Sequence, residues 1–115
     1  MSQRTEKVQK LAREVLGDTI PTLKDPRIGF VTVTAVRMSA DLRHARVFVS
    51  VLADGDERAA TMTALRHATP YLRGELGRQM RLKYLPELVF ELDTTAEDAQ
   101  RLEAIIRELH EGDGP

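Results

Sequence analysis

The sequence predicts one α+β domain in which helices cover a single face of a three-stranded sheet. Three segments alternate apolar and polar residues, as strands do, and four others repeat apolar residues at helical spacing. Their order is helix, strand, strand, bent helix pair, strand and helix. The 115 residues are 42% hydrophobic and include no cysteine. One apolar core is therefore expected to hold the chain without disulfides or a thiolate metal site.

The first element is predicted to be a helix over residues 5–16. Its apolar side chains recur at spacings of three and four, with charged side chains between them, and Gly17 is expected to end it. The next segment, residues 18–29, holds two prolines and a glycine. This composition predicts a loop, which carries Lys24 and Arg27.

Two strands are predicted over residues 30–38 and 43–52, because both segments are rich in β-branched residues and alternate in character. The short turn between them predicts an antiparallel hairpin. Within each strand, alternation places one set of side chains on the same face. This set is Val31, Val33 and Ala35 in the first strand, and Ala45, Val47, Val49 and Val51 in the second. The face opposite the helices is expected to carry Phe30, Val36, Phe48 and, from the third strand, Val89.

A long helical pattern then runs to about Met80, and Pro70 interrupts it because proline lacks an N–H and crowds the preceding turn. Two helices are expected to meet at a bend formed by Ala68, Thr69 and Pro70. Thr69 is then a candidate N-cap, with Pro70 in the first turn of the second helix. A single helix with a mild kink is the alternative. The buried stripe is expected to contain Leu65, Ala68, Leu72 and Leu76.

The last two elements are predicted to be a strand over residues 88–93 and a helix that begins near Thr95. Thr95 and Asp98 have the spacing of a capping box in its acidic form. The final helix is expected either to cover part of the open face of the sheet or to leave that face free for a partner, and residues 111–115 are expected to fray. Its apolar stripe consists of Ala99, Leu102, Ile105, Ile106 and Leu109.

The net charge of −1 conceals two parts of opposite sign. Residues 1–84 carry 15 basic and 9 acidic side chains, a balance of +6, whereas residues 85–115 carry 2 basic and 9 acidic ones, a balance of −7. A basic body favours a nucleic-acid partner, because phosphate contacts depend on local charge. The chain has no apolar run long enough to span a bilayer and no signal-peptide pattern. A soluble cytoplasmic protein without membrane contact is therefore expected.

The residue pattern does not indicate catalysis. His44, His67 and His110 fall on different predicted elements, and no nucleophile lies beside a base in a recognisable pattern. No cofactor, metal or small-molecule substrate is expected, and a small-molecule enzyme is the least favoured alternative. Asp25 is expected to fix its loop. Residues 74–77 spell the GxxG of a phosphate-binding loop, but they include an acid and a residue of the buried stripe, which argues for a chance match.

Cations gather in and after the predicted helix pair. Residues 66–83 contain five basic residues and one acidic residue, and helical phase places Arg66 and Arg73 on one stripe, with Arg81 nearby if the phase continues. This stripe is expected to contact nucleic-acid phosphates without reading base sequence, and alanine at Arg73 and Arg81 to weaken binding without lowering stability. The alternatives are a solvated helix face and a module that binds protein through the open sheet face. The first-rank RNA-binding candidates are Arg66, Arg73, Arg78, Arg81 and Lys83, the second-rank ones are Lys7, Lys10, Lys24, Arg27 and Arg46, and Tyr71 and Tyr84 are candidates for base stacking.

Several short motifs occur in order along the segments DPRIGFVTVTAVRMSADLRHARVFVSVL and LRGELGRQMRLKYLPELVFELD. They include Asp25-Pro26-Arg27, Val31-Thr32-Val33, Leu76-Gly77 and Pro86-Glu87-Leu88. Together, these motifs cover most of the chain and resemble the bacterial ribosome-binding factor A family.

This resemblance implies a type II KH-like fold and a binding role without catalysis. Members of the family bind the free 30S subunit, assist its late maturation and 16S rRNA processing near the 5′-terminal helix, and support growth in the cold. The resemblance therefore implies a monomeric assembly factor, with residues 1–95 as the ribosome-binding domain. Residues 96–115 would form an acidic helix and tail, packed on this domain or loosely attached to it. The family has Ala-x-Gly at the helix bend, where this chain has Pro70 instead of glycine, so a bend with an altered angle is expected.

Overall fold

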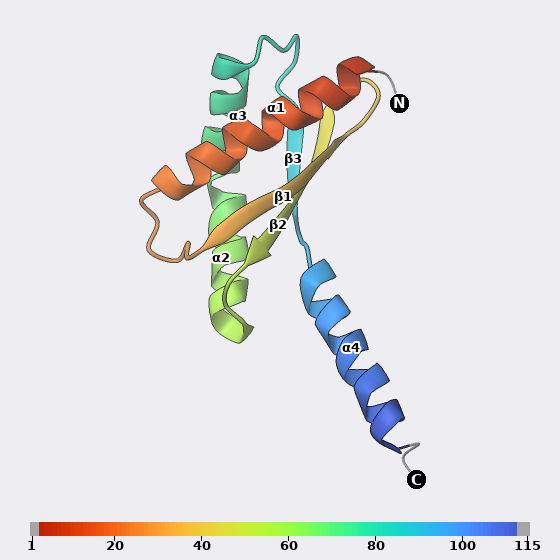
Figure 1. Ribbon diagram of the computed structural model, residues 1–115. Coiled ribbons are helices and arrows are strands. Elements are labelled where there is room, and N and C mark those ends of the chain that lie inside the picture. The colour runs from red at the N-terminus through yellow and green to blue at the C-terminus, as the bar shows by residue number, and fades with distance from the viewer. Residues whose placement is uncertain (1–2, 113–115) are drawn as a thin grey trace.

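The computed structural model describes residues 3–112 and has the predicted α+β architecture (Figure 1). The first half of the chain contains α1 (Gln3–Thr19), the short 3₁₀ helix η1 (Ile20–Thr22), β1 (Val31–Met38) and β2 (His44–Val51). The second half contains α2 (Gly55–His67), α3 (Thr69–Gln79), β3 (Glu87–Leu92) and α4 (Thr95–Gly112). Up to β3, this is the type II KH-like order that the family resemblance implies, and α4 is added at the end.

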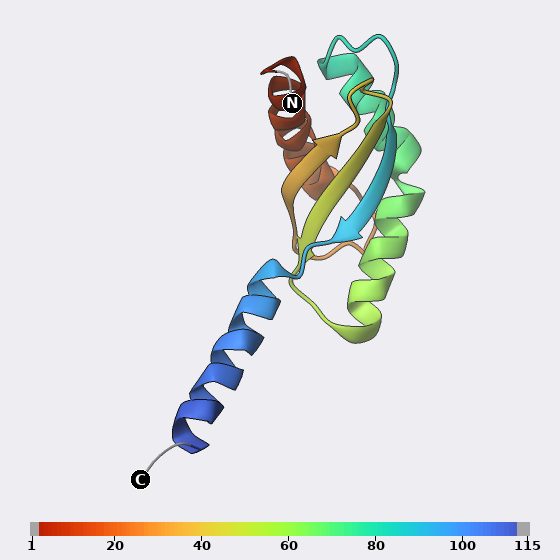
Figure 2. The ribbon, with the colours of Figure 1, turned by 90° about the vertical axis from the view of Figure 1, so that its right-hand side faces the viewer.

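The three strands form one sheet in the order β1-β2-β3. β1 and β2 are the predicted antiparallel hairpin, whereas β2 and β3 run parallel, a pairing that the chain reaches through the α2–α3 crossover. α1, α2 and α3 lie on one face of the sheet and leave the other face open (Figure 1 and Figure 2). Between the helices and the sheet lies the core, whose most deeply buried members include Leu16, Ile20, Val47, Val49, Leu65, Leu72 and Leu76.

A β-bulge in β1 makes the predicted alternation of this strand wrong beyond its middle. The register with β2 shifts between Val33 and Ala35, which leaves Thr34 as the extra residue. The shift reverses the faces that follow. Val36, which simple alternation places on the open face, is only 2% exposed and belongs to the core. The Thr34 hydroxyl instead donates to the carboxylate of Asp93 at the end of β3 (2.6 Å).

α1 is longer than its periodicity predicts, and Gly17 does not end it. The helix continues to Thr19, whose hydroxyl donates to the carbonyl of Val15 (2.7 Å). Pro21 then lies in η1, where the chain leaves the α-helical path. Gly17 is exposed, so the helix tolerates it at the ordinary cost of a helical glycine, about 1 kcal/mol. The expected loop therefore starts later and includes η1.

Two separate helices meet at the bend, as expected, rather than one kinked helix. Ala68 ends α2 and begins α3, with φ −81° and ψ −4°. Thr69 is not the N-cap that its position predicts, because its hydroxyl donates back to the carbonyl of Leu65 (3.2 Å). Pro70 lies in the first turn of α3, where its missing N–H leaves no helical hydrogen bond unmade.

The GxxG tetrapeptide lies inside α3 and is not a loop. Its third residue, Leu76, is fully buried. A Cβ atom at Gly77 would overlap the Leu85 side chain, so the absence of a side chain at this position lets Leu85 pack directly on α3. The chance match inferred from the sequence is consistent with this packing role.

α4 projects away from the rest of the domain and does not cover the open face of the sheet (Figure 1 and Figure 2). None of its residues is buried. Leu102 and Leu109 of its predicted apolar stripe are 58% and 64% exposed. Arg58 of α2 forms an ion pair with Glu97 in the first turn of α4. Within residues 3–112, the ion pairs that tie α4 to the rest of the domain are therefore confined to the start of this helix.

The ends of α4 also differ from the prediction. The hydroxyl of Thr94, not that of Thr95, contacts the Asp98 carboxylate (3.0 Å). The helix continues to Gly112, so residues 111 and 112 are helical rather than frayed, and the remaining residues of the predicted frayed end, 113–115, lie outside the described residues. None of the helices within residues 3–112 combines the length and apolar composition that a membrane span requires.

Candidate nucleic-acid interface

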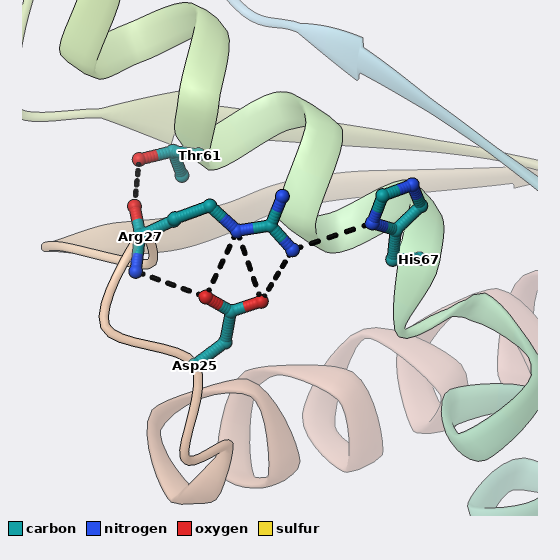
Figure 3. Close-up of polar contacts among 4 residues, drawn as sticks. All are labelled: Asp25, Arg27, Thr61 and His67. Atoms are coloured by element: carbon teal, nitrogen blue, oxygen red, sulfur yellow. Dashed lines mark hydrogen bonds and ion pairs between the residues drawn. The ribbon is translucent and has the colours of Figure 1, made fainter.

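Asp25 and Arg27 fix the loop between η1 and β1 to the end of α2 (Figure 3). The Asp25 carboxylate accepts hydrogen bonds from Nη2 of Arg27 (2.7 Å) and from its backbone N–H (3.0 Å), and these bonds lower the pKa of Asp25 to about 2. The Arg27 carbonyl accepts from the Thr61 hydroxyl (2.8 Å), and Nη2 lies 3.3 Å from Nδ1 of His67. The loop-fixing role expected for Asp25 is confirmed, and the charge of Arg27 is engaged beside the bend.

The helix pair does not carry its arginines in one helical row. The bend interrupts the helical phase, and α3 ends at Gln79, before Arg81. Arg78 forms an ion pair with Glu75 within α3. Arg66 is exposed, and its side chain has no hydrogen-bond or ion-pair partner among the residues that the structure describes. Arg66 and Arg81 are the exposed arginines of this group whose charges no acidic side chain in the described part of the chain neutralises.

Arg73 turns toward the protein. It is half-buried, and its guanidinium donates from Nε to the carbonyl of Pro86 (2.8 Å) and from Nη2 to the carbonyl of Leu85 (3.1 Å). Pro86 is itself fully buried, so Arg73 ties the segment before β3 to α3. Alanine at this position is therefore expected to lower stability, and the sequence-based expectation of an unchanged stability is revised.

The remaining candidate phosphate ligands differ in whether an acidic side chain already holds them. Arg46 pairs with Glu91 on β3 (2.7 Å), so its charge is partly neutralised, as the charge of Arg27 is by Asp25. Apart from Arg73, which backbone carbonyls hold, six of the candidates can contact phosphates without first losing an ion pair. These exposed cations, which have no acidic partner within residues 3–112, are Lys7, Lys10, Lys24, Arg66, Arg81 and Lys83.

Two cations that the sequence patterns do not single out, Arg13 and Arg37, line a groove between α1 and β1. The groove has a volume of about 330 Å³ and is also lined by Lys10 and Glu6. Both arginines are exposed. No local pattern relates them, because one lies on a helix and the other on a strand; the packing of α1 along β1 brings them together.

Within residues 3–112, no three or more acidic, histidine or cysteine side chains are grouped so that they could hold a metal ion. The three histidines lie on separate elements, as predicted. His44 on β2 is 3.8 Å from Glu87, His67 at the end of α2 contacts Arg27, and His110 lies on α4. The exposed cations of the described surface can contact an anionic partner.

The helix-strand-strand-helix-helix-strand order, the bent helix pair and the exposed unpaired cations define a small KH-like domain with a cationic surface. The resemblance of its motifs is confirmed by comparison with known proteins. The chain belongs to the ribosome-binding factor A family, whose family model matches residues 4–106.

Individual relatives are similar over most of their length. Ribosome-binding factor A of Natranaerobius thermophilus is 38% identical over 111 residues, which span 96% of this chain and 85% of that protein. The crystal structure of ribosome-binding factor A from Thermus thermophilus has a TM-score of 0.69 at 32% identity, covering 76% of this chain and 94% of that one. A homology model of Thermus thermophilus ribosome-binding factor A has also been fitted into a cryo-EM map of a complex between the 30S subunit and ribosome-binding factor A. Those coordinates have a TM-score of 0.64 at 30% identity and cover 75% of this chain and 91% of that chain.

Proposed function

We propose that this protein is a ribosome assembly factor that binds the free 30S subunit through its rRNA. Family membership supports this proposal, as does the homology model of a relative that has been fitted into a map of a complex between the 30S subunit and ribosome-binding factor A. The observation that carries the electrostatic part is that six of the candidate cations are exposed and have no acidic partner in residues 3–112. Such cations release counterions when they meet phosphates, which favours binding to RNA.

Four of the six unpaired cations fall into two groups, one toward each end of α3. Arg66 lies just before the bend formed by Ala68, Thr69 and Pro70, and Lys24 lies in the loop that Arg27 ties to His67 at the end of α2. Arg81 and Lys83 follow the end of α3. The 11 residues of α3 place about 16 Å between the two groups. Two groups so separated position a rigid domain on an RNA backbone without reading base sequence.

We assign rRNA binding to residues 1–95 and regard residues 96–115 as an acidic appendage that disfavours nonspecific RNA by repelling phosphates. The finer role is assistance in late subunit maturation and in 16S rRNA processing near the 5′-terminal helix, which supports growth in the cold. The protein acts as a cytoplasmic monomer, without catalysis, a cofactor, a small-molecule substrate or a membrane. The family resemblance supports this role.

The experiment that tests the electrostatic part compares two double variants of equal charge change. If about five phosphates are neutralised, the logarithm of the affinity for free small subunits falls against the logarithm of salt with a slope of about −3.5 to −4.5. Arg66→Gln with Arg81→Gln is expected to reduce the magnitude of this slope by about 1.4 to 1.8. Arg101→Gln with Arg107→Gln, on α4, is the matched control and is expected to leave it unchanged. A salt-independent affinity, or an equal effect of both pairs, contradicts the proposal.

A second candidate function is a protein-binding module that uses the open face and end of the sheet. The observation that favours it is the exposure of Val89 on β3 (55%) and of Phe30 just before β1 (79%). Cosedimentation with nuclease-treated and untreated small subunits separates the two functions, because only RNA-dependent binding is lost after nuclease treatment.

A further inference from the structure

The end of the domain beyond α3 contains a pocket that shares Lys83 with the proposed contacts and whose other lining residues those contacts do not use. It lies where the start of α1, the turn between β1 and β2, and the segment between α3 and β3 come together (Figure 1). Its volume is about 360 Å³, near the lower end of the roughly 300–1,000 Å³ range of ligand pockets. A single nucleotide is of suitable size, whereas a nucleic-acid duplex is not. Leu42, Leu82 and Tyr84 provide its apolar lining, and Arg4 and Lys83 line it with positive charge.

The wall formed by the β1–β2 turn is rigid. Leu42 has a φ of 61°, a left-handed conformation that a branched, bulky residue rarely adopts and that surrounding contacts must hold in place. The Asp41 carboxylate accepts from the Ser39 hydroxyl (2.6 Å) and from the backbone N–H of Arg43 (3.1 Å), and the Leu42 side chain packs against the core. Strain of this kind often accompanies a binding site.

The opposite wall is held as firmly. The guanidinium of Arg73 donates hydrogen bonds to the carbonyls of Leu85 and Pro86, the two residues that follow Tyr84. The backbone N–H of Glu87 donates to the carbonyl of Arg43 (2.8 Å), which ties this wall to the β1–β2 turn. The pocket is therefore preformed, so little ordering is needed when a ligand enters.

The groups in and around the pocket match one chemical class of ligand. The guanidinium of Arg43 lies 4.2 Å from the centroid of the Tyr84 ring, and Nζ of Lys83 lies 5.5 Å from it. Aromatic rings and guanidinium planes are the surfaces on which unpaired RNA bases stack. Arg4 and Lys83 are exposed and, within residues 3–112, have no acidic partner, so both are available to a phosphate. Asp41, the acid in the lining, is already engaged by the turn.

We propose that this pocket receives one unpaired nucleotide of the rRNA, whose base stacks on the Tyr84–Arg43 pair and whose phosphate is held by Lys83 and Arg4. This site rests on the proposed rRNA binding and adds to it a preference for single-stranded RNA. It lies beyond the end of α3 and is therefore distinct from the bend at the start of that helix.

Tyr84→Leu tests the site, and Tyr71→Leu is its matched control. The two tyrosines are similarly exposed, 45% and 54%, and Tyr71 lies on α3 near the bend. Loss of one stacked base is expected to weaken binding to free small subunits by about 5- to 150-fold while leaving the salt slope unchanged, because no charge is removed. Tyr84→Phe keeps the ring and is expected to retain the affinity of the wild type. The control is also expected to bind like the wild type, because Tyr71, although a stacking candidate by residue type, does not line the pocket.

A second measurement uses tyrosine fluorescence, since the chain has two Tyr and no Trp. In the Tyr71→Leu variant of the whole chain, Tyr84 is the only remaining tyrosine. Its emission is expected to be quenched by a short single-stranded adenylate oligoribonucleotide and not by a fully paired RNA duplex.

The two proposals fail in different ways. If wild-type protein does not bind subunits in a salt-dependent manner, rRNA binding itself is wrong. If the wild type binds with the expected slope while Tyr84→Leu binds equally well, or if Tyr84→Phe is weakened as much as Tyr84→Leu, the stacking site is overturned. Equal quenching by single-stranded and duplex RNA overturns it too. Thermal unfolding of each variant excludes misfolding as the cause of weakened binding.

Discussion

Replacing Arg73 by alanine is expected to lower the free energy of unfolding by about 2 kcal/mol. Arg73 donates to the carbonyl of Pro86 (2.8 Å) in a half-buried setting and to that of Leu85 (3.1 Å) at the surface. A hydrogen bond from a charged donor contributes roughly 1.5 kcal/mol in the first setting and about 0.5 kcal/mol in the second, where water screens it. Alanine removes both bonds, and the half-buried carbonyl loses this donor.

Urea unfolding of the full-length protein measures this effect. With a denaturant slope of about 2 kcal/mol/M, the midpoint is expected to fall by about 1 M. Arg73→Lys keeps the charge but cannot reproduce two bonds from a planar fork, so its midpoint is expected to fall about half as far. Arg66→Ala removes the same side chain from an exposed position on α2 and is expected to change stability by less than about 0.5 kcal/mol.

One result would refute the structural role of Arg73. If Arg73→Ala unfolds at the wild-type urea concentration while its salt slope for subunit binding is smaller in magnitude by about 0.7 to 0.9, Arg73 is a phosphate ligand. Its bonds to the segment before β3 would then contribute nothing measurable.

Two further predictions concern stability. The pKa of Asp93 is lowered to about 2, mainly by the hydrogen bond from Thr34. The folded pKa of Asp93 therefore lies below its unfolded value. Its contribution to the free energy of unfolding is present above about pH 4 and is lost as the pH falls toward 2. The urea midpoint of Asp93→Asn is therefore expected to fall less than that of the wild type between these pH values, and an equal fall contradicts the assignment. Leu72→Ala in the core is expected to destabilise by about 3 kcal/mol, whereas Leu102→Ala, 58% exposed on α4, is expected to change stability by less than about 0.5 kcal/mol; similar losses in a denaturation series would contradict the described packing of α4.

The elements of the fold were predictable because helices and strands leave local periods in the sequence. The bend at Ala68 was also predictable from local sequence, because Pro70 restricts the conformation of the residues next to it. The face of Val36 was not, because a single unpaired residue at Thr34 reverses the alternation and no local signal marks a bulge there. The length of α1 was also missed, because Gly17 is a weak terminator when the following residues still form helical hydrogen bonds.

The behaviour of α4 shows a limit of a different kind. Its apolar stripe predicts a partner face, but periodicity carries no information about what that face meets. In the structure, Ile105 and Ile106 remain 48% and 46% exposed. A period of 3.6 residues thus indicates an amphipathic helix without indicating that the domain itself covers it.

The candidate site was predictable as residue types and not as an arrangement. Sequence identifies a surplus of cations but not which of them an acid already holds, and Arg46 and Glu91 are 45 residues apart in the chain. The inward turn of Arg73 depends on backbone carbonyls, which every residue has and which therefore leave no signal in the sequence. Tyr84 could be nominated for stacking from its type alone, whereas its pocket depends on a turn more than 40 residues away.

The most direct measurement is sedimentation of tagged, full-length protein through a ribosome gradient from growing cells, with nuclease-treated samples in parallel. The protein is expected to travel with free small subunits, to be absent from translating ribosomes, and to leave the small-subunit fractions when the exposed rRNA is digested or the salt is raised. A protein that stays at the top of the gradient, or that remains bound to subunits regardless of salt and nuclease, would contradict binding to rRNA through unpaired cations.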